Sequence, residues 1–200
     1  QQVPSDFEWG QRNFEIFLAQ WRIQLQTENR DKAANFLGCC HTWPSWVMKM
    51  KERRFLSLPL HHIDTSVILE KETTENGRYC KKYLNIVGTK YRSVISFPVL
   101  SELFLTVLRL ETFNEKWDML HLITSLIKEK KIAICPPTNI FEAERRIAEI
   151  DERIEPTDRQ IASYAFENNA ILVTLDLNLL ESQGLKNQLG IEVNHPKNLI

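Results

Sequence analysis

The spacing of hydrophobic and polar positions changes about a third of the way along this chain. Before residue 56, large apolar residues recur every three or four positions, which is the spacing of one helix face. Beyond residue 60, short runs that are apolar throughout alternate with stretches of helical period. Such runs predict buried strands of a parallel sheet covered on both faces. The pattern therefore predicts a helical N-terminal extension, residues 1–58, followed by an α/β domain, residues 59–200.

The predicted α/β domain is a three-layer α/β/α sandwich around a parallel sheet of four to five strands. Local signals predict where its elements begin and end. Residues 73–77 form a loop, Ser96 or Phe97 caps one helix, and Asn114 caps another. The predicted strands are 60–64, 91–97, 131–135, 170–174 and 190–193. The predicted helices are 65–72, 78–88, 98–110, 114–130, 140–152, 157–168 and a short piece after Asp176.

The extension carries an apolar stripe and a basic cluster. Each large apolar side chain that stays in water forgoes about 1.5–3 kcal/mol, so we expect the stripe to pack on the α/β domain or on a second copy, and we expect a homodimer. The cluster is a candidate contact for RNA phosphates, although basic helix faces are more often only solvated. The stripe is Phe14, Phe17, Leu18, Trp21 and Leu25; the basic cluster is Lys49, Lys51, Arg53 and Arg54.

Composition narrows the class of protein. The chain is 43% hydrophobic, and its charges nearly cancel at a net charge of −1, so a nucleic-acid partner would need a local patch. No apolar run reaches the roughly 18–20 residues that span a bilayer, and the first ten residues do not resemble a signal peptide. We expect a soluble, cytoplasmic protein with reduced thiols. Its four cysteines fit a disulfide framework or a zinc site poorly; they are Cys39, Cys40, Cys80 and Cys135.

Four acidic residues are expected at one edge of the predicted sheet. Asp64 ends the first strand and Asp176 follows the fourth, while Glu102 and Asp158 lie in the first turns of helices. Ligands of open α/β sheets bind outside the carboxyl ends of the strands. Clustered carboxylates repel one another unless a cation lies among them, and oxygen ligands select Mg²⁺ or Mn²⁺. Such an ion activates water for phosphodiester cleavage. Each acid alone has an ordinary alternative as a turn, cap or solvated residue.

Three segments resemble the PIN-domain nuclease family, which includes VapC-like ribonucleases: HHIDTSVILE (61–70), SELFLTVL (101–108) and PTDRQIASYAFENNAILVTLDLNLL (156–180). The resemblance covers about residues 60–200. It implies a Mg²⁺- or Mn²⁺-dependent endoribonuclease, possible partners being RNA and an antitoxin. The implied catalytic and metal-binding acids are Asp64, Glu102, Asp158 and Asp176, with Thr65, Ser66, Thr174 and Asn178 in support. The sixty residues before the first strand depart from stand-alone toxins of this family.

Other functions fit less well. A non-catalytic PIN-like binding module is the main alternative, although such a module has no reason to keep four acids that repel one another. A phosphatase of the haloacid dehalogenase kind would need a second Asp where Ser66 stands. A phosphate-accepting receiver domain would need an acidic pair where His61 and His62 stand.

Overall fold

A computed structural model describes residues 56–128, 132–135 and 139–200. The predicted apolar stripe and the basic cluster of Lys49, Lys51, Arg53 and Arg54 lie outside these residues, and the domain boundary at residue 58 stays a prediction. Within the described part of the chain, no helix is long and apolar enough to cross a membrane.

The centre of the fold is a five-stranded sheet in the order β3-β2-β1-β4-β5, with every neighbouring pair parallel. The predicted α/β class and parallel sheet are therefore confirmed. β1 is the middle strand, and the strand order reverses between β1 and β4, where ligands of such sheets bind. The strands are β1 (Leu60–Ile63), β2 (Arg92–Ile95), β3 (Ala133–Ile134), β4 (Ile171–Val173) and β5 (Val193–Asn194).

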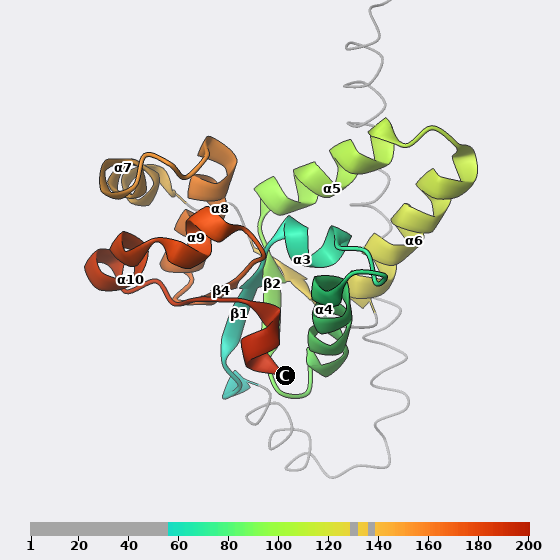
Figure 1. Cartoon of the computed structure of the whole chain (residues 1–200), viewed down its shortest axis with the longest axis horizontal. Helices are drawn as coiled ribbons and strands as arrows, with labels where there is room; N and C mark the ends of the chain where they lie inside the picture. The colour runs from blue at the N-terminus through green and yellow to red at the C-terminus, as the bar shows by residue number, and fades with distance from the viewer. Residues whose placement is uncertain (1–55, 129–131, 136–138) are drawn as a thin grey trace, which may run out of the picture. The chain divides into compact units, whose positions relative to one another are not determined.

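Helices cover both faces of the sheet (Figure 1). The chain moves from β1 to β2 to β3 through α3–α6, then returns past β1 to β4 and β5 through α7–α10, and right-handed crossovers place these two sets on opposite faces. On one side lie α3 (Thr65–Leu69), α4 (Glu75–Ile86), α5 (Phe97–Arg109) and α6 (Phe113–Lys128); on the other lie α7 (Phe141–Ile150), α8 (Pro156–Glu167), α9 (Leu177–Glu181) and α10 (Gln183–Leu189). The turn η2 (Pro196–Leu199) follows β5 and contacts α4.

Two predicted helix starts were wrong, because side-chain caps fix them elsewhere. Thr112, not Asn114, caps α6: its hydroxyl accepts a hydrogen bond from Glu115 N at 3.3 Å, and its own N–H donates to the Glu115 carboxylate at 3.0 Å. α4 begins at Glu75, inside the predicted loop 73–77. There Gly77 N donates to the Thr74 hydroxyl at 2.8 Å. A Cβ at Gly77 would lie 1.8 Å from the backbone oxygen of Lys71, so this helix start requires glycine.

The last predicted strand, 190–193, was also displaced. Residues 183–189 form α10, and Gly190, the first residue of the predicted strand, ends that helix with a left-handed φ of 69°, which glycine adopts without steric cost. β5 then pairs with β4 at Val193 and Asn194. This shift of the strand boundary does not change the strand order, so the acids still lie at the carboxyl ends of the strands.

Candidate active site

Asp64 is the most constrained acid of the four. It caps α3 immediately after β1, and the residue is only 4% exposed. One carboxylate oxygen accepts from Thr65 N at 2.6 Å; the other accepts from the hydroxyls of Ser66 at 2.5 Å and Thr174 at 2.7 Å. Three donors to a buried carboxylate fix its position and offset much of the cost of burying it.

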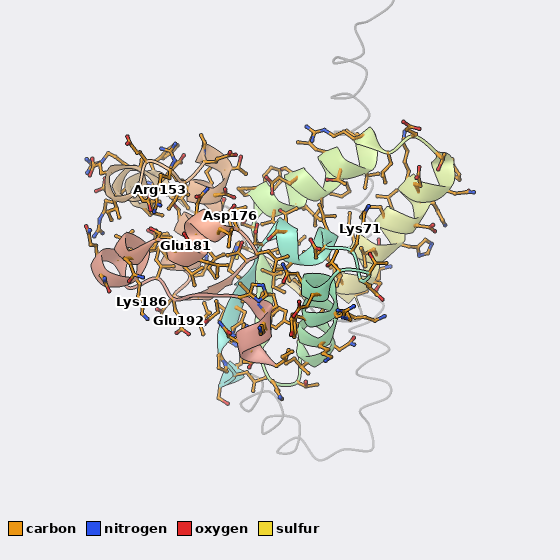
Figure 2. The ribbon with its side chains drawn as sticks, viewed as in Figure 1. Lys71, Arg153, Asp176, Glu181, Lys186 and Glu192 are labelled. Carbon is orange, nitrogen blue, oxygen red and sulfur yellow. The ribbon has the colours of Figure 1, made fainter. Side chains whose placement is uncertain are left out.

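Thr174 links the ends of β1 and β4. The pairing of Ile63 with Val173 places Asp64 beside Thr174, so the two side chains share one face of the sheet. The Thr174 hydroxyl donates to Asp64 and accepts from Asp176 N at 2.9 Å. Asp176 caps α9 by accepting from Leu179 N at 3.0 Å, and Figure 2 labels it beyond the end of β4. One hydroxyl thereby holds two of the predicted acids in register.

Glu102 and Thr65 connect α5 to α3. Ser96 and Pro98 set the start of α5 directly after β2, and Glu102 follows in the second turn. The Thr65 hydroxyl donates a short hydrogen bond to the Glu102 carboxylate. Ser66 connects α3 to the end of β4, because its hydroxyl also accepts a hydrogen bond from Leu175 N at 3.0 Å. The supporting positions Thr65 and Ser66 are thus in contact with the predicted acids.

Asp158 shows that the four acids influence one another. It lies in the first turn of α8, a helix that contacts β1, β4 and α5. Burial raises the pKa of Asp158, and repulsion by Asp64, Asp176, Glu102 and the neighbouring Glu155 raises it further, to about 7. Without a cation, the cluster therefore favours a protonated Asp158 near neutral pH.

The donor set suits a hard divalent ion, because these acids offer only carboxylate oxygens and repel one another. The side chains are not arranged as a finished metal site, however. Among residues 56–128, 132–135 and 139–200, no three His, Cys, Asp or Glu side chains lie together in a way that could hold an ion. An ion would have to draw the carboxylates closer together.

The remaining predicted residues are less engaged. Asn178 is exposed in the first turn of α9. The proposed RNA contacts from Lys49 to Arg54 lie outside the described residues. Cys80 and Cys135 are buried free thiols, and burial raises the pKa of each to about 11, so both stay protonated.

Two residues at this edge were missed by sequence reasoning. Phe97 and Leu177 directly follow the N-caps of α5 and α9, and they are 46% and 66% exposed. No sequence signal separates them from core residues, since large apolar side chains are usually buried.

Comparison with known proteins identifies the family to which the fold corresponds. A family model described as PIN domain matches residues 62–183. This match spans all four acids. No curated protein matches the sequence.

Solved structures share the fold at low sequence identity. VapBC2 from Rickettsia felis, bound to a DNA fragment from its promoter, is 18% identical with a TM-score of 0.52; the match covers 68% of this chain and 98% of that one. VapBC-1 from nontypeable Haemophilus influenzae is 18% identical with a TM-score of 0.51, over 68% and 98%. FitAcB from Neisseria gonorrhoeae is 20% identical with a TM-score of 0.50, over 68% and 97%.

Proposed function

The chain belongs to the PIN domain family, and from that membership we propose that it is a Mg²⁺- or Mn²⁺-dependent endoribonuclease. The proposed reaction is hydrolysis of RNA phosphodiester bonds. Its proposed catalytic and metal-binding residues are Asp64, Glu102, Asp158 and Asp176. The observation that carries the proposal is that the Thr174 hydroxyl holds both Asp64 and Asp176 at the strand-order reversal, while the Thr65 hydroxyl ties Glu102 to the start of α3 beside Asp64. Burial and repulsion by the other three acids raise the pKa of Asp158, and carboxylates that repel one another are well suited to share a cation.

The residues of this chain would divide the work as follows. A bound divalent ion would supply an activated water and a counter-charge for the phosphate. Ser66 and Thr174 fix the Asp64 carboxylate, and Thr65 fixes that of Glu102, which would limit the motion of both groups when an ion binds. Hydrolysis joins a water oxygen to phosphorus and releases one ribose oxygen, which leaves with a proton. Asp158 would supply a further carboxylate to the ion, because an arriving cation favours its ionised form over the protonated form that burial and repulsion favour without one.

The partners of the protein are part of the same proposal. The similar structures are described as VapBC and FitAcB assemblies, and VapBC2 is bound to promoter DNA. We therefore propose a cytoplasmic enzyme that acts as the toxin of a toxin–antitoxin pair or in RNA processing. We also propose that residues 1–58 form a separate helical extension that contributes to a homodimer. Deletion of residues 1–56 should then change the oligomeric state measured by light scattering from dimer to monomer, and an unchanged oligomeric state, solubility and melting temperature would argue against that role.

A second candidate function is a non-catalytic module that binds nucleic acid or protein through the same edge. It is favoured by one observation: among the described residues, no three potential ligands are arranged to hold a metal ion. Calorimetric titration with Mn²⁺ separates the two functions. The enzyme should bind the ion, and the Asp176→Asn variant should bind it at least about tenfold more weakly because a carboxylate ligand is lost.

The direct test of the proposed function is cleavage. Purified full-length protein is incubated with Mn²⁺ and mixed RNA, and the new ends are sequenced. We expect defined ends that Asp176→Asn protein and EDTA both remove. RNA that stays intact while the folded protein binds Mn²⁺ would contradict the nuclease and leave the binding module.

A further inference from the structure

Two exposed apolar residues begin helices on either side of the strand end that carries Asp64. Phe97 and Leu177 are each the first residue of a helix that follows a strand: Phe97 opens α5 after β2, and Leu177 opens α9 after β4. They are 46% and 66% exposed, although most large apolar residues of the domain are buried. Exposed apolar side chains are common on protein surfaces, so it is the place of these two beside the acids, and not their exposure alone, that makes them available to a ligand there.

The sheet places these residues on opposite sides of Asp64. β1 lies between β2 and β4, and its pairing with both sets the positions of the strand ends. The register of His62 with Val94 puts Asp64 level with Ser96, one residue before Phe97. On the other side, Asp176 is held by Thr174, and Leu177 follows it. Because neighbouring strands lie about 4.8 Å apart, the ends of β2 and β4 are about 10 Å apart with Asp64 between them.

From this arrangement we propose that Phe97 and Leu177 contact the two bases on either side of the scissile phosphate. The inference rests on the proposed nuclease function and names the substrate-contacting residues of that site. An RNA strand presents a charged phosphate between two planar, apolar base faces. The edge of this domain presents a set of potential metal ligands between two apolar side chains, in the same order.

The inference also selects the form of the RNA. A base can rest on a protein side chain only after it leaves its own stack, which unpaired nucleotides in loops and ends do readily. Stacking tolerates every base, because each has a π face. Phe97 offers an aromatic ring and should contribute more than Leu177, which offers only aliphatic contact.

A matched control lies elsewhere on the surface. Phe113 opens α6 and is 75% exposed, so it equals Phe97 in chemistry and in its place at the start of a helix. Its neighbours Glu111 and Glu115 are exposed acids, and it stacks on Trp117 at 6.2 Å between ring centroids. It does not follow a strand of the sheet, so it should not touch RNA bound at the acidic edge.

The experiment compares Phe97→Ala, Leu177→Ala and Phe113→Ala with the wild-type protein on an unpaired oligoribonucleotide whose cleavage position has been mapped. Two further substrates carry an abasic nucleotide on the 5′ or the 3′ side of that position. Loss of one stacked base should lower kcat/KM roughly 5- to 150-fold for Phe97→Ala and less for Leu177→Ala. Each loss should vanish on one abasic substrate, a different one for each variant. Phe113→Ala should stay within twofold of the wild type.

Other outcomes overturn the inference. It fails if the Phe97 and Leu177 variants stay within twofold of the wild type, or if their losses persist on both abasic substrates. If the wild-type protein cleaves no RNA, the proposed nuclease fails instead, and binding of the same fluorescent oligonucleotide then decides. Weaker binding by Phe97→Ala than by Phe113→Ala would support base contact, whereas equal binding by all proteins would refute it. Thermal melting confirms that each variant is folded.

Discussion

The middle strand of the sheet carries two kinds of buried polar side chain that differ in what they do. At its carboxyl end, Asp64 is 4% exposed and accepts hydrogen bonds from three residues. Within the strand, His61 and His62 are fully buried. His61 has one partner, the Tyr83 hydroxyl at 2.9 Å from Nδ1, whereas neither ring nitrogen of His62 has a partner among the described residues. Burial alone therefore does not mark a functional polar residue.

Charge separates the two groups. Burial lowers the pKa of His61 to about 4 and that of His62 to about 3, so both rings remain neutral near pH 7 and pack as core residues. His61 also stacks on Tyr91 at 4.1 Å between ring centroids. At the acidic edge, repulsion favours a protonated Asp158, but an arriving cation would reverse that preference. The contrast shows that a buried polar side chain can take part in catalysis where its charge can change when an ion or substrate binds beside it.

The largest test of this contrast removes one acid. Asp176→Asn should lower RNA cleavage by at least about 10⁴-fold, because a charge that would help hold the metal and stabilise the transition state is lost. The fold should survive, since an Asn oxygen can still accept from Leu179 N. Asp64→Asn should also abolish cleavage. It also removes one of the two oxygens that accept hydrogen bonds from the three donors. Initial rates with Mn²⁺ measure both, and cleavage at the wild-type rate by either variant would refute the assignment.

The next test addresses the histidines through pH. A neutral buried histidine makes the unfolded state bind more protons than the folded state below pH 6.5, so stability falls as pH decreases. Between pH 6.5 and 5.0, His61 should cost about 2 kcal/mol of unfolding free energy. The titration of Asp158 changes stability in the opposite direction, so the wild type is compared with His61→Phe. The free energy of unfolding of this variant should fall by about 2 kcal/mol less between the two pH values.

Urea unfolding at the two pH values gives these slopes. His121→Phe, which replaces an exposed histidine on α6, serves as the matched control and should leave the slope unchanged. Equal slopes for the wild type and His61→Phe would show that His61 takes up its proton as readily in the folded as in the unfolded protein, against the lowered pKa.

A smaller effect is expected at the partner of His61. Tyr83→Phe leaves a buried ring nitrogen without its hydrogen bond and should cost about 1–2 kcal/mol, measured by urea unfolding at pH 7. RNA cleavage should not change, because this contact lies on the face of β1 that packs against α4. Tyr79→Phe is the control, since its hydroxyl donates to Glu75 at the surface. Loss of activity without loss of stability in Tyr83→Phe would break the division between the two regions.

The smallest expected effect is a gain. A carboxyl whose pKa is raised in the folded state destabilises the fold as pH rises from about 4 toward 7. Asp158→Asn removes this cost and should raise the melting temperature in EDTA at pH 8. The gain in the free energy of unfolding should be less than about 1 kcal/mol, because solvent screens a half-exposed group. The gain should shrink at pH 5. Mn²⁺ should stabilise the wild type more than the variant, and equal shifts would place the ion elsewhere.

Local patterns were sufficient to predict the elements, because each depends on residues close in sequence. Apolar runs gave the strands that became β1, β2 and β4, and Pro98 and Pro156 lie in the first turns of α5 and α8 as the fixed φ of proline favours. The parallel sheet followed from the alternation of strands and helices, and with it the expectation that the acids meet at one edge. Caps such as Thr112 were harder to assign, because several residues near a helix start are able to act as one.

What the sequence determined is that these acids stand at the ends of buried strands or in the first turns of helices, since that follows from residue type and position along the chain. Tertiary structure decided the rest. Only pairing between β1 and β4 brings Thr174 to Asp64 across 110 positions of sequence. Only packing leaves Phe97 and Leu177 exposed while similar residues become core. Hydrogen bonds and burial depend on neighbours in three dimensions. The residue type and its position along the chain do not show which neighbours a side chain will have.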